Sequence, residues 1–177
     1  MITKNAINNG LFMGVVFIIA SYSLYLADSQ SFINLKSGVL FMPFLLLLFK
    51  TGTDARRANK GFISFGKAFK DLFFASVIGT FICTTFEFML FNYIDPSLKV
   101  TMNELALKGM EDMEGMINSE LYQKVMERFD IEHLYSVSFS VSQYIIRLFV
   151  PCGLFSAMLS MIIKRNSNNL QNKNTEL

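Results

Sequence analysis

The chain has 177 residues, of which 52% are hydrophobic and 17% are charged, and its formal net charge is +2. Its apolar residues cluster in long runs, whereas a soluble core is built from apolar residues dispersed among polar ones. This clustering argues against a soluble domain and predicts an all-α integral membrane protein.

Four apolar segments are long enough to cross a bilayer, because the hydrocarbon core needs about 20 helical residues. We assign them to residues 10–27, 31–50, 71–94 and 136–163. Soluble core helices rarely contain more than about 10 to 14 such residues in a row. Lys36 interrupts the second segment, and we expect its side chain to reach the headgroups. The sequence therefore predicts four transmembrane helices in a single membrane domain, residues 1–165.

Lysine and arginine residues near the spans predict the orientation, because these residues are retained on the cytoplasmic side during insertion. Residues 50–70 hold six Lys or Arg against one Asp, and Lys164 and Arg165 follow the last span. Residues 95–133 instead hold nine acidic and four basic residues. We therefore expect both termini in the cytoplasm, with the polar tail at residues 166–177 disordered there.

The segment between the third and fourth spans, residues 96–133, is predicted to form an external helical hairpin. Thr101 and Glu104 match a capping box, in which two side chains satisfy free amide groups at a helix start. Apolar side chains then recur at helical spacing and give the first helix one apolar face. Ser119 can cap a second helix, and the hairpin would cover the outer end of the bundle or lie on the lipid surface.

Glu87 and Arg147 are charged residues within the apolar spans. A charge at mid-membrane costs about 2.5 to 3.5 kcal/mol on insertion scales, so each residue needs a partner or a function. Their predicted depths differ by about 9 Å, or by less if the fourth span enters the lipid later. We predict an ion pair that orders the third and fourth spans, with Ser140, Gln143 or Tyr144 completing its hydrogen bonds. The alternative is a substrate or proton site.

Pro43 and Pro151 lie inside the second and fourth spans. Each removes one backbone hydrogen bond and frees a carbonyl one turn earlier, so both are predicted to kink their helices. Kinks can gate a pathway, but helix packing is the simpler interpretation. Cys83 and Cys152 also lie within spans, with no second cysteine at metal-ligand spacing, which predicts buried, reduced thiols.

Motifs that would identify an enzyme are absent from the sequence. It contains no HExxH zinc helix, no GxSxG nucleophile turn, no phosphate-binding GxxxxGK[ST] loop and no Cys-x-x-Cys. His133 stands near Asp130 and Glu132, but zinc normally needs three or four protein ligands, so a solvated cluster is the simpler interpretation. We expect no catalysis, cofactor or metal. The basic loop is explained by orientation and anionic headgroups, without nucleic acid.

Several motifs together resemble a known family. They are Gly10-x-x-x-Gly14 in the first span, GFISFGKAFK before the third, NYIDP at its end, and the acidic insertion before the last span. In these features the chain resembles the bacterial membrane proteins of domain-of-unknown-function family 4199, found chiefly in Gram-negative bacteria. The resemblance implies a four-helix inner-membrane protein and no particular activity.

The resemblance also implies roles for four residues at the start of the third span. These residues are Phe65, Lys67, Ala68 and Phe69. They would lie at the membrane interface, where aromatic and basic side chains set the depth at which the span enters the lipid.

Two functions from different classes are compatible with these observations. The first is a non-enzymatic structural or interaction protein whose external hairpin or basic loop contacts a membrane or periplasmic protein, a second copy of the chain, or membrane lipids. The alternative is a small transporter or channel subunit that uses Glu87 and Arg147, with kinks at Pro43 and Pro151. A water-accessible cavity reaching Glu87 favours transport, and a sealed, paired carboxylate favours the first function.

Overall fold

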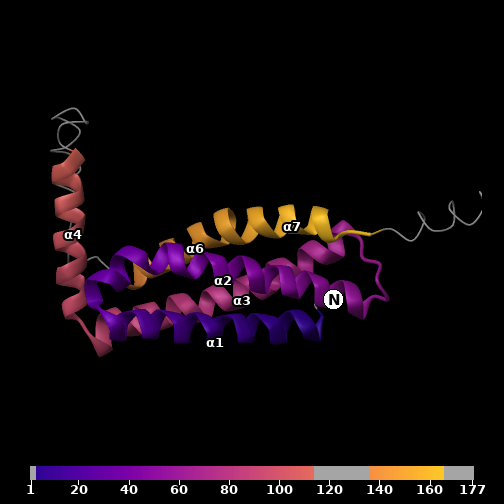
Figure 1. Cartoon of the computed structure of the whole chain (residues 1–177), viewed down its shortest axis with the longest axis horizontal. Coiled ribbons are helices and arrows are strands. Elements are labelled where there is room, and N and C mark those ends of the chain that lie inside the picture. The colour runs from indigo at the N-terminus through magenta and orange to yellow at the C-terminus, as the bar shows by residue number, and fades with distance from the viewer. Residues whose placement is uncertain (1–2, 114–135, 166–177) are drawn as a thin grey trace, which may run out of the picture.

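The computed structural model describes residues 3–113 and 136–165, and nearly all of these residues are helical. Four long helical segments lie side by side, and another helix runs across one end of them (Figure 1). The described ranges contain one isolated β-bridge and no strand, in agreement with the all-α prediction. The elements are α1 (Lys4–Ala27), α2 (Ser29–Ala58), α3 (Phe65–Met89), η1 (Leu90–Ile94), α4 (Ser97–Met113), α6 (Val137–Arg147), η3 (Leu148–Leu154) and α7 (Phe155–Ile163).

Three segments within the described ranges are long and apolar enough to cross a membrane, namely Lys4–Ala27, Phe65–Ile94 and Val137–Ile163. α2 is not among them, so the prediction of four spans is confirmed for three segments and not for residues 31–50. The sequence of α2 supplies a physical reason. Its uncharged run between Lys36 and Lys50 has thirteen residues, fewer than the roughly 20 that a spanning helix needs.

The predicted basic loop is shorter than expected, because the helices on both sides extend beyond their apolar runs. α2 continues to Ala58 and α3 begins at Phe65. Arg56 and Arg57 lie in the last turn of α2, where positive charge interacts favourably with the helix dipole. In the remaining connection Gly61 has a φ of 85°, a conformation that favours glycine, and it turns the chain toward α3.

Ile63 and Arg165 join this connection to the end of the last helix. The amide of Ile63 donates to the carbonyl of Arg165 at 3.1 Å, and the amide of Arg165 donates to the carbonyl of Ile63 at 3.0 Å. This antiparallel bridge holds Lys164 and Arg165 beside the basic connection. The basic residues that were separate in the sequence therefore lie at one end of the bundle, the end at which α1 begins (Figure 1).

Glycine allows α1 and α3 to approach each other closely. A Cβ at Gly10 would lie 2.8 Å from the carbonyl oxygen of Ala75, and a Cβ at Gly14 would lie 2.7 Å from the side chain of Ile82. A Cβ at Gly79 of α3 would likewise lie only 2.9 Å from the side chain of Met13 on α1. The small residues of the first span therefore serve packing within the chain, as small-residue pairs do in many membrane helices.

Two apolar clusters fill the bundle. The larger cluster draws buried residues from α1, α2, α3, η3 and α7, whereas the smaller one lies where α4 meets the other helices. Phe32, Leu90, Phe91 and Leu98 form the smaller cluster. It anchors the first turn of α4 to the bundle, because Leu98 is almost completely buried there.

α4 begins at Ser97, so the predicted capping box is wrong. Thr101 lies inside the helix, and its hydroxyl donates to the carbonyl of Ser97 at 3.4 Å. Asp95 supplies the polar group at the helix start, since its Oδ1 accepts from the amide of Ser97 at 3.1 Å. The predicted second helix of the hairpin, His133, and the tail at residues 166–177 lie outside the described residues.

Candidate functional site

Glu87 and Arg147 meet between α3 and α6. Oε2 of Glu87 lies 2.9 Å from Nη2 of Arg147. The side chain of Glu87 is 4% exposed and that of Arg147 is 28% exposed. Thr84, one turn before Glu87 on α3, accepts a hydrogen bond on Oγ1 from Nη1 of Arg147 at 3.2 Å. The guanidinium therefore bridges a carboxylate and a hydroxyl of the same helix, which is a strong charge-assisted arrangement.

Helix geometry explains why residues predicted to differ in depth by about 9 Å are in contact. The difference of about 9 Å was counted from Leu134, where the apolar stretch begins, whereas α6 begins at Val137. Moving the start by three residues reduces the difference in depth to about 5 Å, at 1.5 Å per residue. The long arginine side chain covers the remaining distance.

Thr84 is the member of the site that the sequence prediction missed, since that prediction looked for hydroxyls on the fourth span. Tyr144 donates instead to the carbonyl of Val77 at 3.4 Å. The hydroxyl of Ser140 is buried and has no hydrogen-bond partner in the described structure. A signal for Thr84 was present, because a residue three positions before Glu87 lies on the same helix face.

The π-helical segment η3 aligns the last span with α3. Arg147 contacts Thr84, and Sγ of Cys152 lies 3.2 Å from Oγ1 of Thr80. The partners on α3 are four residues apart, whereas those on the last span are five apart. A π-turn inserts one extra residue into a helix, so η3 keeps both contacts on one side.

The two prolines differ in their surroundings. Pro151 lies within η3, where the altered hydrogen-bonding pattern accommodates the amide that proline lacks. Pro43 lies within α2, which continues as α-helix on both sides of it. The disturbance predicted for the fourth span therefore takes the form of a π-helix, next to the contact made by Cys152.

Buried polar side chains continue along the contact between α3 and the last span. On α3 they include Ser76, Thr80, Thr84 and Glu87, and on the last span Ser156 and Ser160. Their spacing of three to four residues along each helix keeps them on one face. This contact is polar along much of its length, although the helices that form it are apolar overall.

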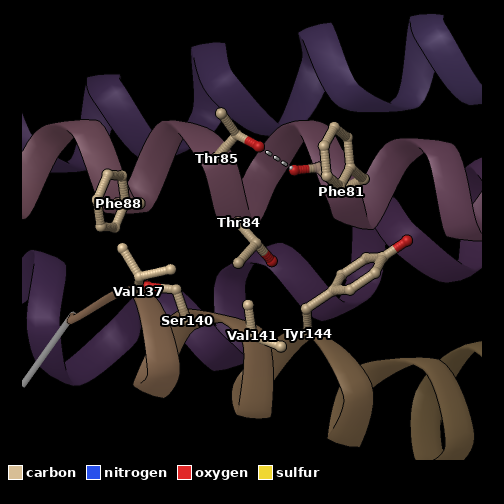
Figure 2. Close-up of a pocket in the computed structure, with 8 residues that line it drawn as sticks. All are labelled: Phe81, Thr84, Thr85, Phe88, Val137, Ser140, Val141 and Tyr144. Atoms are coloured by element: carbon tan, nitrogen blue, oxygen red, sulfur yellow. Dashed lines mark hydrogen bonds between the residues drawn. The ribbon is translucent and has the colours of Figure 1, made fainter.

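A groove of about 180 Å³ lies between α3 and α6, next to Thr84 (Figure 2). The rings of Phe81 and Tyr144 meet edge to face across it, with centroids 5.7 Å apart. α3 contributes Phe81, Thr84, Thr85 and Phe88 to its walls, and α6 contributes Val137, Ser140, Val141 and Tyr144. The walls are therefore mainly apolar, with a few hydroxyl groups.

The residues that the family resemblance assigned to the interface lie at the start of α3. Phe65 and Phe69 stack with centroids 6.1 Å apart, and Phe73 continues the stack. Nζ of Lys67 donates to Oδ1 of Asn59 across the connection between α2 and α3. Ala68 is completely buried, so it contributes to packing within the bundle.

The site is an ion pair between a buried carboxylate and a partly exposed guanidinium. Within the described residues, no group of three His, Cys, Asp or Glu side chains is arranged to hold a metal ion. Cys83 and Cys152 are both buried and neither forms a disulfide, as predicted. An enclosed pair of this kind is stable only while both charges remain, since removing one leaves the other uncompensated.

Comparison with known proteins identifies the family. No curated protein and no solved structure matches the chain. One family model, described as a protein of unknown function (DUF4199), matches residues 8–165. The matched range includes the Glu87–Arg147 pair, the groove and all of α2, α3 and α4. The chain therefore belongs to the DUF4199 family of proteins of unknown function.

Proposed function

We propose that this protein is a non-enzymatic, multi-pass protein of the bacterial inner membrane that acts by contact with another protein. The observation that carries this proposal is the enclosed Glu87–Arg147 pair, with a carboxylate that is 4% exposed and bound at 2.9 Å. A substrate or ion needs access to such a charge, and here a protein side chain occupies it. The pair therefore stabilises the packing of α3 against α6, and the ends of the bundle remain available to a partner protein.

The chain crosses the membrane four times in this proposal, because the directions of α1 and α3 require it. Gly10 contacts Ala75 and Gly14 contacts Ile82, so residue numbers increase in the same direction along both helices. α1 and α3 each qualify as spans, and α2 connects the far end of α1 to the near end of α3. α2 must therefore return through the membrane, and its exposed apolar side chains, such as Met42 and Leu46, would face lipid.

The basic end of the bundle is cytoplasmic in this proposal, and the end with α4 faces the periplasm. Lys60, Lys67, Lys70, Lys164 and Arg165 are solvent-exposed basic residues at the first end. Positive charge is retained on the cytoplasmic side during insertion. A reporter enzyme active only in the periplasm should work when inserted after residue 113 and should fail when inserted after residue 60; the opposite result would reverse the orientation.

α4 is the surface proposed for the partner. It runs across the end of the bundle (Figure 1) and is fixed there by Leu98, while Val100, Glu104 and Lys108 are exposed. One apolar and two oppositely charged side chains of α4 are therefore open to a partner. The partner would be a periplasmic or membrane protein, or a second copy of the chain.

Photo-crosslinking tests the contact. A photoreactive residue at Val100, which is 55% exposed on α4, should give a discrete protein adduct in cells. The control position is Phe149, which is 77% exposed on the flank of the last span, where lipid is the expected neighbour. An adduct of twice the 20.2 kDa chain mass would identify a second copy as the partner. Lipid adducts alone at Val100 and at Glu104 would contradict the proposal.

Cysteine labelling separates this function from transport. In a variant with Cys83 and Cys152 replaced by alanine, single cysteines at Thr80, Thr84 and Ser140 should resist a water-soluble maleimide from both sides. A cysteine at Val100 should react and provides the control. Labelling at the buried positions would mean a hydrated path reaching the ion pair and would favour a transporter or channel subunit.

A further inference from the structure

Five exposed basic side chains form a patch at the end of the bundle where α1 begins. They come from the connection between α2 and α3, the first turns of α3 and the end of the last span, and we call them the basic patch: Lys60, Lys67, Lys70, Lys164 and Arg165. The backbone bridge between Ile63 and Arg165 joins the last two to the connection. Segments far apart in the sequence therefore contribute to one charged surface (Figure 1).

Acidic side chains do not neutralise the basic patch within the described residues. At this end, residues 3–9, 50–71 and 164–165 hold nine Lys or Arg and two Asp. Asp54 is bound to Lys50 at 2.8 Å, and Asp71 is only 2% exposed. Lys67 donates to a neutral group, the amide oxygen of Asn59. The positive charge of the patch is therefore available to an external anion.

The described part of the opposite end has a different charge balance. Residues 95–113 hold four acidic and two basic residues. The two basic residues are Lys99, which donates to Oδ1 of Asn92 at 2.7 Å, and the exposed Lys108. Attraction for anions should therefore be concentrated at the basic end, and Lys99 and Lys108 provide a control for the effect of total charge.

Apolar side chains beside the basic patch indicate which kind of anion fits. Lys164 directly follows Ile163, the last residue of α7. In the last turn of α7, Met161 is 61% exposed and Ile162 is 69% exposed. A phospholipid carries its charge next to apolar chains, so it matches both features at once. A soluble polyanion such as a nucleic acid matches only the charges.

We propose that the basic patch binds the headgroups of anionic phospholipids in the adjoining leaflet. The phosphates lie beside Lys70, Lys164 and Arg165, and the acyl chains lie along Met161 and Ile162. Each Lys or Arg near an anionic membrane surface strengthens binding about fivefold. The binding requires no partner protein, so it is independent of the contact proposed for α4.

Retention of lipids from a mixed bilayer tests the proposal. The full chain is extracted from bilayers made of equal amounts of dioleoyl phosphatidylglycerol and dioleoyl phosphatidylethanolamine, and mass spectrometry quantifies the lipids that stay bound. The wild-type protein should retain the anionic phosphatidylglycerol about fivefold over phosphatidylethanolamine, the factor expected for one net charge. Sodium chloride at about 1 M should remove this preference, because the Debye length falls to about 3 Å.

Two variants test both parts of the basic patch. Lys164→Gln/Arg165→Gln removes two charges at the end of the last span, and Lys60→Gln/Lys70→Gln removes two charges beside the start of α3. Each double variant should abolish the preference for phosphatidylglycerol. Far-ultraviolet circular dichroism and size-exclusion chromatography check that both variants fold.

A matched control separates the basic patch from the total charge of the protein. Lys99→Gln/Lys108→Gln removes the same number of charges from the α4 end and should keep the wild-type preference. A second control adds a single-stranded oligonucleotide to the wild-type protein at the same phosphate concentration as the lipid. The oligonucleotide should leave the bound phosphatidylglycerol in place, because it cannot match the apolar side chains.

Four results would overturn the proposal. Equal retention of the two lipids by the wild type, or an unchanged preference in both patch variants, would mean that the basic patch selects no lipid. An equal loss of preference in the control at Lys99 and Lys108 would mean that total charge determines retention. Displacement of the lipid by the oligonucleotide would identify a general polyanion surface. None of these results bears on the proposed contact at α4.

Discussion

α3 packs against its neighbours on two faces, and the two contacts are built in opposite ways. On the face toward α1, Gly10 and Gly14 remove side chains so that the backbones approach, with the carbonyl of Ala75 only 2.8 Å from where a Cβ at Gly10 would stand. On the face toward the last span, polar groups fill the contact, including the Glu87–Arg147 pair. The first contact depends on shape and the second on charge.

This difference explains how α3 can pack against two helices, although α1 fits closely against it and α6 leaves free space. Without hydrophobic force between helices in lipid, association depends on close packing and on hydrogen bonds. The glycine contact has little free space, so it needs no polar groups. The contact with α6 leaves a groove of about 180 Å³, and the ion pair next to it compensates for the missing packing.

Breaking the ion pair should have the largest effect on stability. Arg147→Gln strands the carboxylate of Glu87, whose side chain is 4% exposed, and should lower the free energy of unfolding by about 3–5 kcal/mol. Glu87→Gln should cost less, because Arg147 is partly exposed. The double variant should be milder than the sum of both changes. Unfolding by sodium dodecyl sulfate in mixed micelles measures all three, and additive effects would refute the coupling.

Filling the glycine contact should have the next largest effect. Gly10→Ala places a methyl group 2.8 Å from a backbone carbonyl oxygen, and overpacking of this kind costs about 1–3 kcal/mol. Gly66→Ala is the control, since a Cβ there meets nothing within 4 Å. The same unfolding titration compares the two variants. Equal stability of Gly10→Ala and the wild type would mean that α1 and α3 are not in close contact.

The hydrogen bond between Tyr25 and Asp95, at the end of the bundle next to α4, tests whether the close packing of α1 also depends on polar groups. The hydroxyl of Tyr25 on α1 donates to Oδ2 of Asp95 at 3.1 Å, so Tyr25→Phe should lower stability by about 1 kcal/mol. Tyr22→Phe is the matched control, because it keeps the ring that packs edge to face on Phe86. If both changes have the same effect in thermal unfolding, the bond to Asp95 contributes nothing.

The smallest expected effect is the pH dependence of a pair at the basic end. Hydrogen bonding from Lys50, at 2.8 Å, holds the pKa of Asp54 below its ordinary value of 3.8. Because the folded-state pKa is depressed, this contribution to stability is present above pH 3.8 and is lost as the pH falls through the lower folded-state pKa. Asp54→Asn should therefore flatten the change in melting temperature below pH 3.8. An unchanged profile would contradict the assignment.

Several elements followed directly from the sequence. The last span was predicted at residues 136–163 and is found from Val137 to Ile163, because its ends are marked by Ser136 and Lys164. The helix start at Thr101 was wrong, because a capping pattern occurs by chance within helices and Asp95 provides the competing group. Residues 31–50 were assigned as a span by apolarity, but their uncharged run is short.

The sequence by itself determined that the chain is helical, with segments long and apolar enough to cross a membrane, and that Glu87 and Arg147 need partners there, because these conclusions depend only on local composition and on the cost of a charge in lipid. The sequence analysis predicted their pairing, which the structure shows, but only the tertiary structure revealed Thr84 as a further partner of Arg147. It also decided where the groove lies and that the buried hydroxyl of Ser140 has no hydrogen-bond partner in the described structure. The physical reason is that the register between two helices depends on the π-turn at η3 and on packing across the bundle, which no single segment encodes.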